Sequence, residues 1–357
     1  MIDFSRRGVD SALPPVDVDH SIRPMIVNRL WAHSIPAGRG FRPVFLAGLW
    51  MSAGLVGCTS EKAAVPVFHF DEREWNYRGI KGTELESMHY VLRTTCRDED
   101  FVAYIPMFLE ECWGRYSKFL PTDYVLQEPS RTYLFQRRIE WERFTDDFAP
   151  SRAAIYKRIK SGGYSERGVT VSQYSSQKST LSVLAHEGLH QYLELTHGKP
   201  IPPWLNEGLA CYFEGFHMEK GRPVFTPEFN TTRSSSLRLT LAHGQLIPLR
   251  KILGTHAGRE IQEHSTHVRT YYAQIWALVV YLLQPAYKNP YHDGFQRLLN
   301  ELGTETMRRK ANAYLAADTE GEISQGEAIF LAYVSEDIDA FEADFEAFVR
   351  NMLGMEF

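Results

Sequence analysis

The chain has 357 residues, of which 44% are hydrophobic and 23% charged, a composition typical of a folded protein and unlike that of a disordered one. Its 39 basic and 44 acidic residues give a net charge of −5, so no overall positive field is available to attract nucleic acid. The 4 cysteines contain no CxxC pair, which argues against a disulfide framework and against a thiolate zinc cluster. Any metal site should therefore use histidine and carboxylate ligands.

An uncharged stretch near the N-terminus is typical of a signal peptide. Residues 44–57, VFLAGLWMSAGLVG, have the length of its apolar region and follow Arg39 and Arg42. The stretch is shorter than the ~18 apolar residues that suggest a transmembrane helix. It ends in LVG followed by Cys58, which resembles the lipobox of bacterial lipoproteins. The resemblance implies that Cys58 is lipidated and that the protein is anchored to a membrane of the bacterial cell envelope. A buried helix with a chance cysteine is the alternative interpretation.

A signal peptide beginning at residue 1 would be too long, so Met25 is a candidate for the true start. Residues 1–57 are then an N-terminal extension and signal peptide. Residues 58–80 show no clear periodicity and are expected to be a tether.

The body is expected at residues 81–357, at this length as one domain after a long N-terminal segment. Alternating apolar residues predict strands at 88–95, 133–135 and 168–174 within a sheet-bearing part, 81–176. Helical spacing predicts helices at 98–120 and 138–148, and then a mainly helical part, 177–357, with helices at 180–196, 203–215, 234–243, 268–285, 291–302, 306–316 and 338–352. The predicted fold class is α+β, with a small mixed sheet preceding the helix at 180–196.

That helix contains His186-Glu187-Gly188-Leu189-His190, an HExxH motif. Residues four apart lie on one helix face, so both imidazoles can reach one Zn²⁺ while Glu187 lies beside it. Catalytic zinc generally has three protein ligands. Glu207, in the sequence PWLNEGLA, is the candidate third ligand, because a second antiparallel helix could return it to the histidines.

The sequences HEGLH and WLNEGLACYFE together resemble the HExxH…E pattern of gluzincins, zinc metallopeptidases of the peptidase MA-like superfamily. The resemblance implies a zincin active-site helix, one Zn²⁺ held by His186, His190 and Glu207, and Glu187 as general base. Zinc would activate a water and polarise the scissile carbonyl, while Glu187 accepts a proton and passes it to the leaving amine. A later stretch, YYAQIWALVVYLL, also resembles the helical part of uncharacterised bacterial members.

In gluzincins a downstream Tyr or His often stabilises the oxyanion. The resemblance makes Tyr272 or its neighbour Tyr271 the candidate, although tyrosines at helical spacing are often core residues. Less favoured candidates are His243, His264 and His267. The strand at 168–174 is either the edge strand that binds extended peptides in this superfamily or an ordinary strand of the sheet.

The remaining cysteines have simpler expectations. Cys211 is expected to be a buried packing residue, and Cys96 and Cys112 could pair in an oxidising envelope. The predicted function is zinc-dependent hydrolysis of peptide bonds. The alternatives are a catalytically inactive, zinc-stabilised envelope scaffold or binding lipoprotein, and zinc-assisted hydrolysis of another substrate. Glu187 favours catalysis, because holding zinc does not require it.

Overall fold

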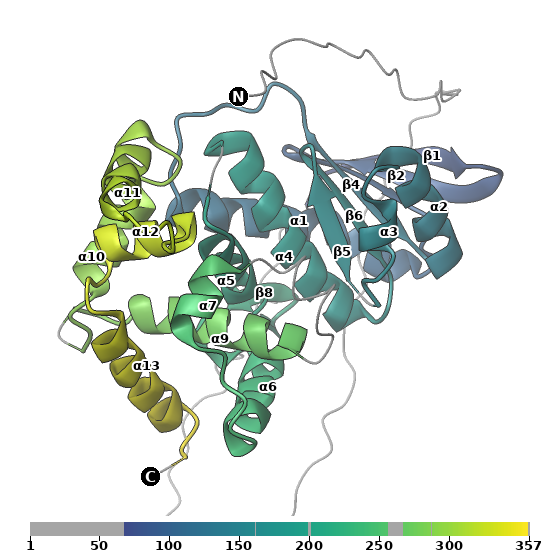
Figure 1. Ribbon diagram of the computed structural model, residues 1–357. Helices are drawn as coiled ribbons and strands as arrows, with labels where there is room; N and C mark the ends of the chain where they lie inside the picture. The colour runs from purple at the N-terminus through teal and green to yellow at the C-terminus, as the bar shows by residue number, and fades with distance from the viewer. Residues whose placement is uncertain (1–67, 161, 199–200, 256–266, 287, 356–357) are drawn as a thin grey trace, which may run out of the picture.

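The computed structural model describes residues 68–160, 162–198, 201–255, 267–286 and 288–355. It consists of a six-stranded sheet, which lies to the right in Figure 1, and a helical C-terminal part to its left. The predicted α+β class with a small mixed sheet and a helical C-terminal part is confirmed at this level. Cys58 and Met25 lie outside the described residues.

The sheet is mixed, with the strand order β1-β2-β3-β4-β6-β5. β3 and β4, and β4 and β6, pair parallel, and the other neighbours pair antiparallel. The strands are β1 (Asp71–Tyr77), β2 (Ile80–Glu86), β3 (Tyr90–Thr94), β4 (Ser130–Phe135), β5 (Gly163–Glu166) and β6 (Val169–Gln173).

The structure shortens one predicted segment and decides between two alternatives for one predicted strand. The predicted tether, 58–80, is too long, because β1 occupies its C-terminal end and pairs along its length with β2. The sequence does not predict β1 because its first four residues, 71–74, are charged. Charged residues are common on an exposed sheet edge. The predicted strand 168–174 is confirmed as β6. It lies between β4 and β5, so it is an ordinary strand of the sheet, and β5 is the edge strand.

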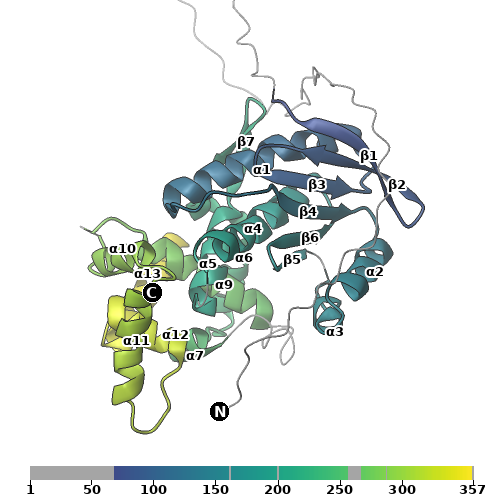
Figure 2. The ribbon, with the colours of Figure 1, turned by 90° about the horizontal axis from the view of Figure 1, so that it is seen from above.

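Helices cover both faces of the sheet (Figure 2). α2 (Arg138–Phe148) and α3 (Ala153–Tyr156) lie on one face, and α1 (Glu99–Phe119) and α4 (Gln177–Thr196) lie on the other. After α4 come α5 (Pro203–Phe213), the hairpin β7 (Phe216–Glu219) and β8 (Arg222–Phe225), and the 3-10 turn η1 (Pro227–Phe229). The remaining helices are α6 (Thr231–Ala242), α7 (Leu249–Gly254), α9 (His267–Leu282), α10 (His292–Asn300), α11 (Glu305–Ala317), α12 (Gln325–Tyr333) and α13 (Ile338–Met352). Among the described helices, none combines the length and the apolar character needed to cross a membrane.

The two faces of the sheet pack into different cores. Alternate side chains point to opposite faces of a strand. Under α2 and α3 the strands contribute aromatic residues such as Tyr133, Phe135 and Tyr164, which pack around Trp141. The other face packs against α1 and α4 and joins the larger core, which continues into the C-terminal helices. This larger core fixes α4 between the sheet and α5.

The helix α5 is held closely against α9. Trp204, Leu205 and Leu209 of α5 are fully buried. A Cβ atom at Gly208 would lie 2.7 Å from Val279 Cγ2, so glycine allows the two helices to approach. The position of Glu207, one residue earlier, is therefore fixed by the core.

The described cysteines Cys96, Cys112 and Cys211 are free. A bond between Cys96 and Cys112, which the sequence left possible, is absent from the structure, and Cys112 lies on the buried face of α1. Cys211 is fully buried, as predicted.

Candidate metal centre

The two histidines of the HExxH motif lie in the middle of α4, one turn apart. Ser176, directly before α4, is its N-cap: its side chain accepts a hydrogen bond from the Ser179 N–H. Serine is a common residue at this position. Its apolar residues, including Leu184 and Leu189, are buried in the main core. Because α4 is fixed in this way, His186 and His190 both face α5.

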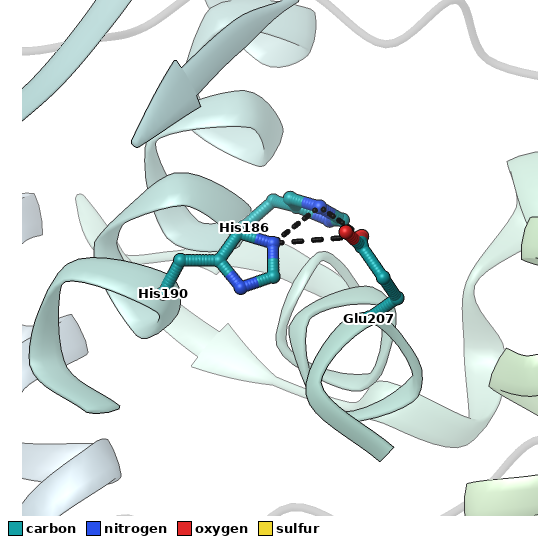
Figure 3. A group of neighbouring side chains, drawn as sticks. All are labelled: His186, His190 and Glu207. Atoms are coloured by element: carbon teal, nitrogen blue, oxygen red, sulfur yellow. Dashed lines mark hydrogen bonds and ion pairs between the residues drawn. The ribbon is translucent and has the colours of Figure 1, made fainter. Parts of the chain in front are cut away.

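Three potential ligand atoms from α4 and α5 converge on one point (Figure 3). The two Nε2 atoms of His186 and His190 are 3.2 Å apart, and Glu207 Oε2 lies 3.3 Å from the first and 3.5 Å from the second. Ligands at about 2.0–2.1 Å around a tetrahedral ion are separated by about 3.3–3.4 Å. Glu207 Oε2 is buried, and the groups nearest to it that the structure describes are these two imidazole nitrogens. The three side chains therefore have the spacing and the open acceptor that a metal ion needs.

The far nitrogen of each imidazole has an oxygen partner. His186 Nδ1 lies 2.8 Å from Glu214 Oε1, and His190 Nδ1 lies 3.0 Å from Asn206 Oδ1. In the neutral form, a ring that donates a proton from Nδ1 to its oxygen partner leaves the Nε2 lone pair for a metal. Oxygen acceptors of this kind orient metal-binding histidines in proteins generally.

Glu214 is itself held in place by α6 and its N-cap. Arg233 Nε donates to Glu214 Oε2 at 2.8 Å and Arg233 Nη2 to Oε1 at 2.5 Å, while Asn230 Nδ2 donates to Oε2 at 3.0 Å. Burial alone would raise the pKa of the Glu214 carboxyl, but Arg233 and His186 outweigh it and lower the pKa to about 2. Glu214 is therefore a carboxylate fixed against His186.

The electrostatics of the ligand group follow from its close packing. Burial would raise the pKa of Glu207, but His190 and His186 hold it well below its usual range. Burial would lower the pKa of His186, but Cys211, Glu207 and Glu214 raise it well above its usual value. The carboxylate of Glu207 therefore favours a positive charge beside it, between the two imidazoles.

A second group of potential ligands, His186, Cys211 and Glu214, fits a metal less well. Burial raises the pKa of the Cys211 thiol to about 11, so the thiol stays protonated and is a poor ligand. Both oxygens of Glu214 are already engaged by Arg233. The group with His190 and Glu207 is therefore the candidate metal centre.

Glu187 is on the side of α4 that faces the sheet. It is 7% exposed, and Thr170 Oγ1 lies 3.4 Å from its backbone oxygen, to which the hydroxyl donates. Burial raises the pKa of its carboxyl, although His186 and His190 act in the opposite direction. Glu187 is therefore a buried carboxyl on α4, next in sequence to the candidate ligand His186.

The structure separates the two tyrosines of α9. The Tyr272 ring lies 6.0 Å from the His186 ring and contacts the Arg233 guanidinium at 4.9 Å. Burial, Glu207 and Cys211 raise the pKa of Tyr272 well above its usual value, so its hydroxyl stays a donor. Tyr271 is fully buried and its hydroxyl donates to the Thr255 carbonyl. Tyr272 is thus the tyrosine beside the metal centre.

The structure describes two of the three histidine alternatives. His243 ends α6, is exposed, and its Nδ1 donates to the Leu239 carbonyl at 2.7 Å. His267 begins α9, and His264 lies outside the described residues.

The structure also brings in residues that the sequence analysis did not select: Asn206, Glu214, Asn230 and Arg233. Glu214 follows Glu207 by seven residues, two helical turns, so a search for polar residues on that face could have found it. Asn206 directly precedes Glu207 and lies on a different side of the helix, so that search would have missed it. No local pattern marks Arg233, which reaches Glu214 from another helix.

Searches with protein-family models, among curated proteins and among solved structures found no match for this chain. The interpretation of the site therefore depends on its own chemistry.

Proposed function

We propose that this protein is a zinc-dependent metallopeptidase that holds one Zn²⁺ with His186, His190 and Glu207. The observation that supports this best is the triangle of two Nε2 atoms and one carboxylate oxygen, with edges of 3.2 to 3.5 Å. Two imidazoles and a carboxylate are a common ligand set of catalytic zinc, and leave a fourth position open.

When bound, zinc would polarise a substrate carbonyl and lower the pKa of a nearby water. Glu187 would accept a proton from the attacking water and deliver it to the leaving amine. The Tyr272 hydroxyl would donate a hydrogen bond to the oxyanion of the reacting carbonyl. Asn206 and Glu214 would keep both imidazoles in the orientation and tautomer that expose Nε2.

Peptides or proteins are the proposed substrates. Glu187 supports a hydrolytic role over a scaffold held together by zinc, because three ligands are already present without it. The spacing HExxH with a later Glu, which resembles the gluzincin pattern, favours peptide bonds over other substrates.

We also propose that Cys58 carries a lipid that anchors the protein to a membrane of the bacterial cell envelope. The support is the apolar stretch 44–57 with its basic flank and the LVG sequence before Cys58. Mass spectrometry of the N-terminal peptide of the native protein tests this. A lipid on Cys58 is expected, and a native chain that retains residues 1–57 would contradict it.

The experiment that tests the function is hydrolysis of a peptide library by the zinc-loaded full chain, compared with Glu187→Gln. The variant should hold as much zinc as the wild type and lose hydrolysis, because it lacks the base but keeps the ligands. Glu194→Gln, on the same helix two turns later, is the matched control and should remain active. A wild type that binds zinc and cleaves no peptide would favour the scaffold or another substrate class.

A further inference from the structure

Arg233, in the first turn of α6, contacts two different parts of the candidate site. Its guanidinium makes a two-point contact with Glu214, in which Nε donates to Oε2 at 2.8 Å and Nη2 donates to Oε1 at 2.5 Å. Cζ of the same group lies 4.9 Å from the centroid of the Tyr272 ring. The Arg233 side chain is only 17% exposed, and arginine stays protonated in proteins. One largely buried cation therefore joins Glu214 and Tyr272.

The contact with Glu214 continues to a candidate metal ligand. Glu214 Oε1 lies 2.8 Å from His186 Nδ1, so the carboxylate that Arg233 holds is also the partner of this imidazole. A two-point contact between a guanidinium and a carboxylate fixes direction as well as distance, which a single point charge does not. The orientation of the His186 ring therefore depends on Arg233 through one intermediate side chain.

The contact with Tyr272 is a cation–π interaction, in which the face of the ring attracts the positive charge. On its other contacts the Tyr272 ring meets the His186 ring, with centroids 6.0 Å apart and planes at 69°. Tyr272 is only partly buried, whereas its neighbour Tyr271 is fully buried in the core. Core packing therefore restrains the Tyr272 ring less, and the Arg233 guanidinium supplies a specific restraint.

The position of Arg233 is itself fixed by the start of α6. Asn230, the N-cap of this helix, accepts a hydrogen bond from the Arg233 N–H at 3.2 Å and donates one to Glu214 Oε2 at 3.0 Å. Further along, the buried hydroxyls of Thr240 and Thr270 lie 3.0 Å apart and join α6 to α9, the helix that carries Tyr272. The contacts of Arg233 therefore follow from the packing of α6.

We propose that Arg233 is a positioning residue that aligns the candidate ligand His186, through Glu214, with the Tyr272 ring, which it contacts directly. The contacts are properties of the fold, while their effect on turnover rests on the proposed peptidase function. Loss of Arg233 should therefore change zinc affinity, and should also change kcat when the site is saturated with zinc. A residue that only stabilised the fold would leave both unchanged in the folded protein.

A double-mutant cycle in the full chain, at one saturating zinc concentration, tests the contact with Tyr272. Arg233→Met, Tyr272→Leu and the double variant are unfolded by urea, and their unfolding equilibrium constants are compared. A cation–π contact should give a coupling of about twofold or more. The matched control is Arg238→Met at an exposed position of the same helix, and its effect should be independent of Tyr272→Leu. A smaller coupling for Arg233, or an equal one for Arg238, would overturn the proposal.

Zinc affinity, measured by competition with a chromophoric chelator, tests the path through Glu214. Arg233→Met should weaken zinc binding about 5- to 20-fold, because it acts on His186 through one intermediate residue. When Glu214→Gln is already present, Arg233→Met should have less than about a twofold further effect, since both changes act on the same imidazole. Wild-type affinity in Arg233→Met, or an undiminished effect in the Glu214→Gln background, would overturn the proposal.

Peptide hydrolysis at saturating zinc supplies the third measurement. Arg233→Met should lower kcat about 5- to 20-fold with little change in KM. Arg233→Lys should not restore kcat, because lysine keeps the charge but lacks the planar two-point group. Wild-type kcat in either variant would overturn the positioning role. A zinc-loaded wild type without hydrolysis would defeat the proposed function alone, since the coupling and the zinc affinity are measured without turnover.

Discussion

The two faces of the same sheet differ sharply where β4, β5 and β6 lie. The face under α2 and α3 is packed with aromatic rings, including Tyr133, Phe135 and Tyr164. Apart from Leu134, the face under α4 carries small residues there, most of them with a hydroxyl group: Ser130, Thr132, Gly163, Ser165, Thr170 and Ser172. Several of these hydroxyls are buried and without hydrogen-bond partners in the described structure.

The two faces contribute differently to the stability of the fold. The aromatic face buries large apolar area and stabilises the sheet. The polar face is less favourable for folding, because buried polar groups need partners. It is also the face against which α4 lies, the helix that carries Glu187 and the candidate ligands His186 and His190. The aromatic face therefore offsets the cost of burying polar groups on the opposite face. Substitutions on each face can separate the two contributions to stability.

The largest expected effect is at the metal centre. Glu207→Ala removes one of three ligands and should weaken zinc binding by well over ~100-fold, more than the loss of a residue that only orients a ligand. Competition with a chromophoric chelator measures the affinity. The exposed Glu228→Ala, on η1, is the control and should bind as the wild type does. Equal affinity in both variants would exclude Glu207 as a ligand.

A smaller loss is expected from Glu214→Gln. The variant leaves the three ligands in place but weakens the acceptor of His186 Nδ1–H, so zinc affinity should fall about 10- to 100-fold. The same chelator competition measures it, with circular dichroism to verify folding. If zinc affinity stayed at the wild-type value, Glu214 would have no role in orienting His186.

The space between β5 and α4 is tested by Gly163→Ala. The added Cβ would approach Ser172 Oγ and the Val171 carbonyl to 2.6 and 2.8 Å, so the protein should lose about 1–3 kcal/mol of unfolding free energy. Gly114→Ala in α1 is the matched control. Its Cβ meets nothing within 4 Å, and it should stabilise the helix by about 0.5–1 kcal/mol. Urea unfolding measures both, and equal effects would show that the space at Gly163 is not restricted.

The smallest expected effect sharpens the contrast between the faces. Thr132→Val keeps the shape of a buried side chain on the polar face but removes a hydroxyl that has no partner in the described structure. The change should leave stability unchanged or raise it by up to about 1 kcal/mol, with zinc binding unaffected. A loss of more than about 1 kcal/mol in thermal or urea unfolding would mean that this hydroxyl has a stabilising partner.

The sequence predicts the fold well where one periodicity dominates a long segment. The predicted bounds of the helices at 138–148 and 338–352 match those of α2 and α13. Short or charged elements were not predicted: α7 and α12 are brief, β1 is largely charged, and β5 has four residues. Their formation depends on pairing and packing with distant segments, which local patterns do not contain.

Some residues of the candidate site can likewise be predicted from the sequence, and others cannot. His186, Glu187, His190 and Glu207 could be selected in advance, because fixed spacings on two helices indicate them. Arg233 could not, since the fold alone brings α6 to Glu214. The choice between Tyr271 and Tyr272 also required the structure, because adjacent residues on a helix point in different directions.

The most direct test of the account is the zinc content of the purified full chain, measured by elemental mass spectrometry after reconstitution. Wild type should hold about one zinc ion per chain, and His190→Ala should hold none. His197→Ala, at the C-terminal end of the same helix, is the control and should retain the ion. A folded wild-type chain without zinc, or His190→Ala with as much zinc as the wild type, would contradict the metal centre and the peptidase function built on it.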